Sequence, residues 1–312
     1  MANQNPIGIV TVTYNSADVL PDFLRCIAAQ THREFILFAV DNASKDETVR
    51  ILRECTDDRL IIIANPDNRG VAGGNNQGIR AALEAGCRSV LLINNDTDFE
   101  PNLLAQLDQG LSTYRVDMAC PKMMYYDHPD RIWAAGGEFQ RWLGYRSVHL
   151  GEGEADHGQY DTPRLVTYVP TCCVLIKKEV FETIGVMDER YFVYSDDVDF
   201  MYRAMRAGVK LMYLPEAKLL HKVGSLCGGE NSPLGLQYST RNRMFFLLKH
   251  FGMAYALPWM LVRQVYYFCQ FLVAQKGLEW LRLKQSSLWQ AFGMYMASPQ
   301  KQPTSVPRIR PS

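Results

Sequence analysis

The sequence predicts an α/β fold in which helices flank a mostly parallel sheet, followed by a helical region at the C-terminal end. Two observations predict this fold class. Short apolar, β-branched runs alternate with amphipathic stretches over the first part of the chain, as in sheets that helices cover on both faces. The 312 residues are 47% hydrophobic, which supplies enough apolar side chains for a substantial core.

The first half of the chain repeats the order strand, loop, helix. Each apolar run is short, and each amphipathic stretch has apolar residues at helical spacing. In open α/β sheets ligands bind beyond the carboxyl ends of the strands, so the polar residues after each strand are candidate site residues. Strands are predicted at 7–13, 34–40, 60–64 and 89–93, and helices at 17–30, 46–55 and 75–85.

The second half of the chain is less regular. Turn residues are frequent from 119 to 168, which indicates irregular structure with antiparallel strands. An acidic segment at 195–199 then opens a helix, and a glycine- and serine-rich loop leads to the C-terminal helical region. The tail after Ser298 is expected to be flexible. Further strands are predicted at 174–177 and 210–214, and helices at 178–184 and 237–250.

Charge and cysteine content exclude several classes of protein. Thirty-three basic and 33 acidic residues cancel, so no overall field would attract nucleic acid. The eight cysteines lack metal-ligand spacing, and residues 1–6 lack the charged and apolar parts of a secretory leader. We therefore expect a cytoplasmic protein without a disulfide scaffold. No G-x-G-x-x-G follows the first strand, which disfavours a dinucleotide-dependent oxidoreductase.

Residues 251–284 are apolar and aromatic, with basic residues interspersed. Pro258, Arg263 and Gln264 make 251–273 a poor membrane-spanning helix. Two alternatives remain: a helix packed on the preceding domain, or an amphipathic surface in the membrane interface. We favour the second, with peripheral contact at the cytoplasmic face of a membrane.

Two polar segments follow the second and third predicted strands. Asp41 could accept hydrogen bonds from a nucleoside base or ribose, or it could form an Asx-turn and cap the next helix. Residues 68–76 combine three glycines, one arginine and three asparagines. This composition would let the backbone approach a ligand, although an ordinary tight turn has it too.

The strand at 89–93 ends in the polar residues Asn94, Asn95 and Asp96. Their oxygens are hard ligands, which suit Mg²⁺ or Mn²⁺ bridging two phosphates. The alternative is a capped turn before the helix that starts near Pro101.

Asp196, Asp197 and Asp199 crowd one predicted helix start. Some of this charge simply suits the helix dipole. Crowded or buried carboxyl groups also raise one another's pKa, as a general base requires, so a catalytic carboxylate is expected here. His221 follows a predicted strand and a short apolar run, where a histidine is either structural or a ligand.

Taken in order, these segments resemble family-2 glycosyltransferases of the GT-A fold, most closely their rhamnosyltransferase-like branch. The resemblance covers residues 5–250 and implies a Rossmann-like, nucleotide-binding mixed sheet flanked by helices. Asn94 stands where the family has the first acid of its D-x-D motif, so Asp96 becomes the main metal ligand. The motifs that carry the resemblance are 10–16, Asp41, 68–76, 94–96, 196–197, 220–224 and 241–243.

The resemblance also implies the roles of individual residues. Asp197 has the position of the catalytic base, with Asp196 and Asp199 as supporting acids. Asp96 and His221 are the implied ligands of a divalent metal, Mn²⁺ or Mg²⁺. The implied nucleotide-sugar-binding residues are Thr13, Tyr14, Asn15, Asp41, Asn68, Gly70, Gly74, Asn75, Asn95, Asp96 and Arg241.

The implied activity is inverting transfer of a sugar, with rhamnose a candidate, from a UDP- or dTDP-sugar to an acceptor hydroxyl. The acceptor would be a glycan or lipid-linked sugar in cell-surface polysaccharide or glycolipid biosynthesis. Residues 1–225 would form the catalytic domain, divided into a nucleotide-sugar-binding half, 1–118, and an acceptor-binding half, 119–225. Residues 226–312 would form the helical, membrane-associating region.

Two other functions remain as alternatives. A sugar-phosphate nucleotidylyltransferase usually has a basic, glycine-rich loop after its first strand, and residues 14–18 contain neither glycine nor a basic residue. A catalytically degenerate protein would bind nucleotide sugars without turnover. The presence of Asp96, Asp197 and His221 together argues against that alternative.

Overall fold

The structure, a computed structural model, describes residues 5–223, 232–274 and 276–297. The chain divides into two compact units, residues 1–229 and 230–312. The predicted boundary after residue 225 and the predicted tail after Ser298 lie outside the described residues.

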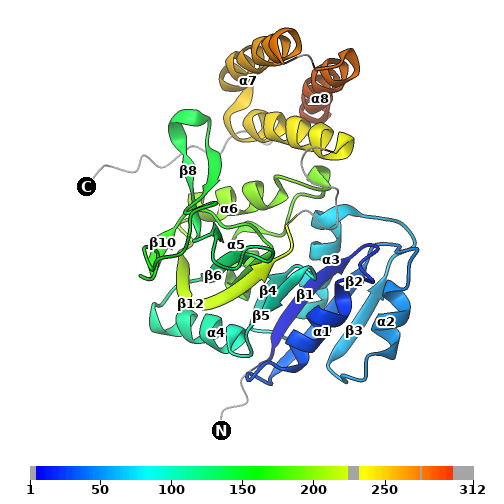
Figure 1. The fold of residues 1–312 in the computed structure, drawn as a ribbon, viewed down its shortest axis with the longest axis vertical. Coiled ribbons are helices and arrows are strands. Elements are labelled where there is room, and N and C mark those ends of the chain that lie inside the picture. The colour runs from blue at the N-terminus through cyan, green and yellow to red at the C-terminus, as the bar shows by residue number, and fades with distance from the viewer. Residues whose placement is uncertain (1–4, 224–231, 275, 298–312) are drawn as a thin grey trace. The chain divides into compact units, whose positions relative to one another are not determined.

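The first unit is built on a ten-stranded sheet in the order β10-β12-β6-β11-β4-β1-β2-β3, with β5 and β7 off this path. Figure 1 shows β1, β2, β3 and β4 side by side. These four strands are parallel and apolar, as strands buried on both faces are. They match the predicted strands within one residue: β1 Ile7–Thr13, β2 Phe35–Asp41, β3 Leu60–Ala64 and β4 Ser89–Ile93.

The other half of the sheet is mixed. β11 lies antiparallel between β4 and β6, while β12 is parallel to β6. Neighbouring parallel strands need a crossover, usually a helix, and no α-helix separates β6 from β11. The mixed sheet is therefore confirmed, and "mostly parallel" holds only for the first half. The strands are β5 Thr97–Phe99, β6 Met118–Tyr125, β7 Ile132–Ala134, β10 Arg164–Val166, β11 Cys173–Lys177 and β12 Leu211–His221.

Helices cover the sheet through their apolar sides. In α1, Leu20, Phe23 and Ile27 are buried at helical spacing. Helix α3 packs against β1 and β2, and α4 packs against β6 and β12. The helices of the first unit are α1 Leu20–Ala28, α2 Thr48–Glu54, α3 Gly70–Glu84, α4 Leu103–Thr113, α5 Lys178–Ile184 and α6 Asp196–Arg206.

The glycine-rich segment corrects one prediction. Helix α3 begins at Gly70 and not at Asn75, so these glycines form its first turn. A Cβ at Gly74 would lie 2.8 Å from Cγ1 of Val12, and a Cβ at Gly78 would lie 2.3 Å from Cγ1 of Val10. The glycines therefore let the helix approach β1 closely.

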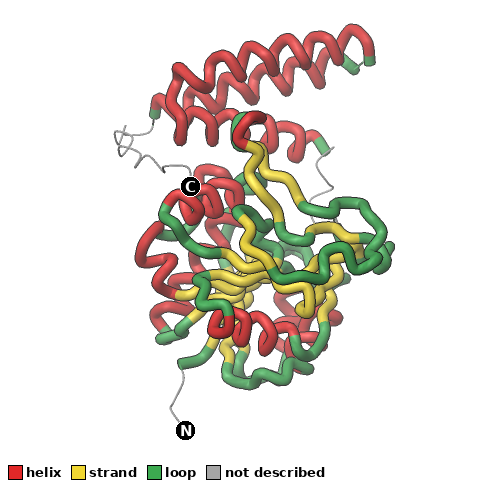
Figure 2. Tube along the Cα trace, turned by 90° about the vertical axis from the view of Figure 1, so that its left-hand side faces the viewer, coloured by secondary structure: helices red, strands yellow, loops and turns green. Residues whose placement is uncertain are grey.

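A hairpin projects from the mixed half of the sheet, formed by β8 Gly137–Gln140 and β9 Arg146–His149 (Figures 1 and 2). Its strands are antiparallel, in agreement with the expectation for 119–168. The short 3₁₀-helix Arg141–Leu143 connects them.

The second unit contains α7 Pro233–Val273 and α8 Leu278–Met296. Gly252 is non-helical, with φ 74° and ψ 176°, and interrupts α7. Between the two helices the buried Lys284 donates to Oγ1 of Thr240 at 2.7 Å and to the carbonyl of Leu236 at 3.2 Å. By length and composition α7 could cross a membrane, and it is the one helix among the described residues that could.

Candidate active site

Asp41 lies at the carboxyl end of β2 with both carboxylate oxygens engaged. Its neighbour in the parallel register is Thr13, whose hydroxyl donates to Oδ1 at 2.9 Å. The backbone N–H of Ser44 donates to Oδ2 at 3.0 Å, and the Ser44 hydroxyl donates to Oδ1 at 2.5 Å. Asp41 is buried, and its hydrogen bonds hold the loop that follows β2 at the carboxyl end of the strand.

The loop after β1 is tied to the loop after β2. Asn15 has a positive φ of 50°. Its backbone N–H donates to Oγ of Ser44 at 2.8 Å, and its Oδ1 accepts from the N–H of Lys45 at 2.8 Å. Tyr14 is 40% exposed. The structure thus brings Thr13, Tyr14 and Asn15 beside Asp41, as expected from their strand ends.

The predicted residues of the glycine-rich segment lie at the start of α3. Oδ1 of Asn68 accepts from the N–H of Gly70 at 2.8 Å. Asn75 is buried, with its amide 3.7 Å from the sulfur of Met187. The close packing of α3 on the sheet is enough to explain why residue 74 is a glycine. Contact between this segment and a nucleotide therefore stays a prediction.

Asp96 and His221 meet through strand pairing. β12 runs antiparallel to β5, which places His221 opposite Thr97, the residue after Asp96. Nε2 of His221 lies 3.3 Å from Oδ1 of Asp96, and the two side chains are 8% and 5% exposed. Asn95 is held nearby, because its amide donates to the carbonyl of Val12 at 2.9 Å.

The chemistry of this pair fits a divalent cation. A carboxylate and an imidazole that converge within 3.3 Å are the mixed oxygen and nitrogen donors that Mn²⁺ accepts. Oδ1 of Asn95 and Nδ1 of His221 are buried and have no hydrogen-bond partner among the described residues. No group of three histidine, cysteine or acidic side chains in the described part of the chain is placed so that it could hold a metal ion by itself. Phosphate oxygens and water would have to complete the coordination.

Asp196 and Asp197 are the first two residues of α6. The hydroxyl of Tyr168 donates to Oδ2 of Asp197 at 2.6 Å, and the N–H of Val198 donates to Oδ1 at 2.7 Å. Burial, and then the charge of Asp197, raises the pKa of Asp196 to about 8. Burial also raises the pKa of Asp197, and the Tyr168 hydrogen bond opposes that rise.

The turn before these acids has an unusual backbone. Phe192, Tyr194 and Ser195 have φ values of 64°, 64° and 63°, a conformation that side chains other than glycine adopt at a cost and that often occurs at functional sites. The carbonyl of Phe192 accepts from the N–H of Val71 at 2.6 Å. A Cβ at Gly70 would lie 2.4 Å from that carbonyl oxygen. Because Gly70 has no side chain, the turn at Phe192 can pack against the start of α3.

Two of the predicted site residues, Asp199 and Arg241, have contacts that differ from those of the residues described above. Asp199 is fully buried and pairs with Nε of Arg203 at 2.9 Å. It also accepts from the hydroxyl of Tyr191 at 3.2 Å. These contacts favour a structural role over a supporting one in catalysis. Arg241 lies on α7 in the second unit, with its guanidinium 4.3 Å from the ring of Tyr238, and its contact with a diphosphate stays a prediction.

Sequence reasoning missed Tyr168, whose hydroxyl contacts Asp197, and the aromatic residues Trp133 and His149 beside it. They come from the irregular segment, where no periodic pattern or motif distinguishes an active-site residue from a core residue. Their position depends on strand pairing, so no local signal could have revealed them.

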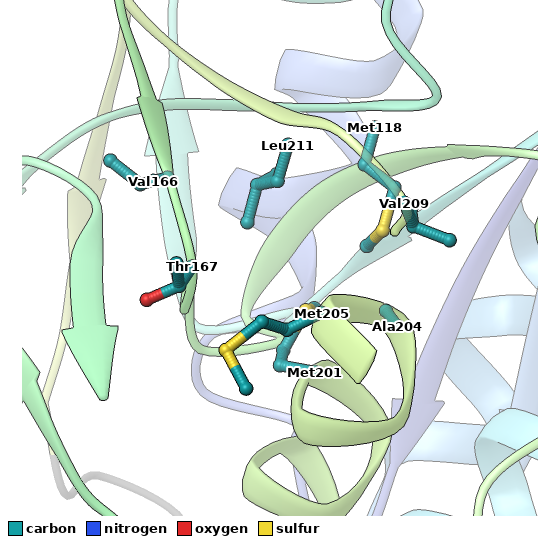
Figure 3. A pocket seen from close by; sticks show the side chains of 8 residues that line it. All are labelled: Met118, Val166, Thr167, Met201, Ala204, Met205, Val209 and Leu211. Carbon is teal, nitrogen blue, oxygen red and sulfur yellow. The ribbon is translucent and has the colours of Figure 1, made fainter. Parts of the chain in front are cut away.

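A small cavity lies apart from this site. It has a volume of about 40 Å³ and lies beside α6 and strands β6, β10 and β12 (Figure 3). This volume is far too small for a nucleotide sugar, and none of the predicted site residues lines it. It is lined by Met118, Val166, Thr167, Met201, Ala204, Met205, Val209 and Leu211.

Comparisons with known proteins show what this chain is similar to. The family model described as "Glycosyl transferase family 2" matches residues 8–185. The dTDP-rhamnosyl transferase RfbF of Shigella flexneri is 24% identical over 251 residues, which cover 78% of this chain and 80% of that protein. Galactofuranosyltransferase GlfT1 of Mycobacterium tuberculosis is 27% identical over 297 residues, covering 91% of this chain and 96% of that protein.

A solved structure confirms the fold class. The S. aureus TarS 1–349 structure in complex with UDP-GlcNAc superposes with a TM-score of 0.60 at 17% identity. The match covers 93% of this chain and 80% of that one. The GT-A fold, with C-terminal helices, is therefore confirmed.

Proposed function

This chain belongs to glycosyltransferase family 2, and from that premise we propose that it moves a sugar, with inversion, from a UDP- or dTDP-sugar to a glycan or lipid-linked acceptor. Rhamnose is the first sugar to test, because relatives such as RfbF are named as rhamnosyltransferases. The product would be a cell-surface polysaccharide or glycolipid. One observation carries the proposal: a hydrogen-bonded, raised-pKa carboxyl group and the Asp96–His221 pair occur in the same unit of the fold.

The proposed reaction is a single displacement at the anomeric carbon. Asp197 accepts the proton of the acceptor hydroxyl as that oxygen bonds to the anomeric carbon and the diphosphate leaves from the opposite side. Attack opposite the leaving group inverts the configuration. A divalent ion held by Asp96 and His221 would supply Lewis-acid stabilisation of the diphosphate charge. Asp41 would contact the nucleoside.

A thermal-shift panel tests the donor class. UDP, dTDP, GDP and CDP are each added with and without Mn²⁺. A ligand at a hundred times its Kd adds about 2.7 kcal/mol to stability if it binds only the folded state, which is a shift of several degrees. We expect a Mn²⁺-dependent shift with UDP or dTDP that Asp96→Asn removes. Equal shifts with and without Mn²⁺ would contradict the metal assignment.

We also propose peripheral membrane contact through residues 251–284. Five exposed apolar side chains on α7 lie on one helical stripe, with Leu261 and Leu272 each 61% exposed, and Val262 and Tyr266 beside the stripe are exposed as well. A separate side of the same helix, including Met260 and Tyr267, is buried. From 251 to 297 there are four basic residues and one acid, Glu279. An apolar stripe with excess positive charge suits an anionic lipid surface. The stripe consists of Leu257, Leu261, Val265, Phe268 and Leu272.

A further inference from the structure

A series of aromatic contacts joins the candidate metal ligands to the candidate base. The ring of Trp133 lies 4.4 Å from that of His221, tilted by 59°. The same indole lies 4.8 Å from the ring of His149 in an edge arrangement. His149 in turn stacks on Tyr168 at 5.9 Å and 15°, and Tyr168 donates to Asp197.

Strand pairing in the irregular half builds this series. Trp133 comes from β7 and His149 from the end of β9, where it pairs with Gly137. Gly137 also bridges to Tyr168. A Cβ at Gly137 would lie 2.8 Å from Cδ1 of Tyr168 and 2.5 Å from the carbonyl oxygen of Val148. The absence of a side chain at Gly137 therefore lets β8, β9 and Tyr168 come together.

The three rings differ in exposure, and this difference suggests their roles. Tyr168 is buried at 4% exposure, and its hydroxyl is committed to Asp197. Trp133 and His149 are half-buried. A half-buried indole provides a flat apolar surface, and an imidazole beside it provides polar groups, the combination that orients ligands in binding sites.

We propose that Trp133 and His149 form the docking surface for the acceptor sugar, and that Tyr168 is a positioning residue that holds Asp197 toward it. The apolar C–H face of the sugar ring packs on the indole, and its reacting hydroxyl points to Asp197. This assignment rests on the proposed function. The location suits an acceptor at the reacting end of the donor, because Trp133 contacts the candidate metal ligand His221 on one side and is connected through His149 and Tyr168 to the group that takes the acceptor's proton.

Kinetics of Trp133 variants of the full-length chain test the assignment. The assay measures nucleoside diphosphate release from UDP- and dTDP-sugars with Mn²⁺, with and without a mixture of octyl glycosides of common hexoses. The stimulating glycoside is then titrated alone. In Trp133→Ala we expect its KM to rise roughly tenfold, equivalent to about 1.4 kcal/mol, with donor KM unchanged. Trp133→Phe, which keeps an aromatic ring, should fall in between.

Two controls separate binding from folding. Trp142→Ala removes an indole that is 95% exposed, on the 3₁₀-helix Arg141–Leu143, and should leave both KM values unchanged. The Mn²⁺-dependent nucleotide shift in melting temperature should persist in both Trp133 variants, because a folded donor site produces it.

Several results would overturn the inference. The first is an acceptor KM within twofold of the wild-type value in both Trp133 variants. The second is a rise in KM that is confined to the donor. The third is cleavage of the donor that no glycoside stimulates. Failure of the proposed function looks different. In that case the wild-type chain neither cleaves a nucleotide sugar nor shows a Mn²⁺-dependent shift with any nucleotide.

Discussion

Asp196 and Asp197 are adjacent in the chain, but their carboxyl groups have different surroundings and therefore differ in how readily they accept a proton. Asp196 is buried, and one of its oxygens has no hydrogen-bond partner in the described part of the chain. With a pKa of about 8 it is mostly protonated at neutral pH. Asp197 has a hydroxyl and a backbone N–H as donors, which favour its ionised form. Asp197 is therefore the better proton acceptor.

Replacing Asp197 tests its assignment as the base. General-base catalysis typically contributes about 10²–10⁴-fold, so Asp197→Asn should lower kcat by a factor in that range. The Mn²⁺-dependent nucleotide shift in melting temperature should remain, because the carboxylate acts on the acceptor. Asp58→Asn, at an exposed position, serves as the control. Near wild-type turnover in Asp197→Asn would rule out this residue as the base.

Removing the Tyr168 hydroxyl should change the pH dependence. Its hydrogen bond lowers the pKa of Asp197 against the effect of burial, so Tyr168→Phe raises that pKa further. The base acts only when ionised, and activity rises as pH increases through its pKa. The acid limb of the kcat profile should therefore move to higher pH. Tyr114→Phe, a change at a 41% exposed residue, should leave the limb in place. An unmoved limb in Tyr168→Phe would limit Tyr168 to packing.

Helix α3 illustrates how residues with the composition of a ligand-binding loop can serve the packing of a helix on a sheet. Its glycines resemble a ligand-binding loop in sequence, and in the structure they form the interface with β1. Gly70 adds a second contact, to the turn that precedes the candidate catalytic acids. The position of the acids therefore depends on how closely α3 approaches its neighbours.

Substitution of Gly78 tests this close packing. A Cβ there would lie 2.3 Å from Cγ1 of Val10, a stiff β-branched side chain, and overpacking of this kind costs about 1–3 kcal/mol. Gly78→Ala should lower the free energy of unfolding by that amount in a urea titration. Gly293→Ala, on α8 with no atom within 4 Å of the added Cβ, should have no cost or stabilise by up to about 1 kcal/mol. Equal effects of the two substitutions would contradict the packing argument.

The whole chain combines a catalytic unit with a second unit that exposes an apolar stripe. A contiguous exposed apolar surface commonly marks an interaction site. An enzyme that uses a lipid-linked acceptor would benefit from such a surface, since the acceptor sugar stays near the membrane.

Vesicle binding by the full-length chain tests the proposed membrane contact. We expect co-sedimentation with anionic phospholipid vesicles at low salt and weaker binding at high salt, because screening reduces the contribution of the basic residues. The double change Leu261→Asp and Val265→Asp should abolish it. Leu165→Asp, at a 60% exposed position in β10, should not. Failure of the wild-type chain to bind at low salt would end the proposal.

Prediction from sequence was most accurate where neighbouring residues determine structure. The four parallel strands were predicted within one residue, because buried strands are continuous apolar runs bounded by polar residues. The helix beginning at Gly70 was placed too late, because glycine has a low intrinsic helix propensity and only packing against Val10 and Val12 overrides it. The short strand β5 and the extension of β12 to His221 were missed, since their partner strands are distant in sequence.

The α/β fold class, the polar ends of the strands and the acids at the start of α6 follow from the sequence, since periodicity and composition are local properties. The contacts of His221 with Asp96, of Tyr168 with Asp197 and of Trp133 with His221 and His149 are visible only in the folded chain. Each of these contacts joins residues far apart in the chain. Strand register creates them, and register follows from the burial of whole faces of the sheet, which no single segment specifies.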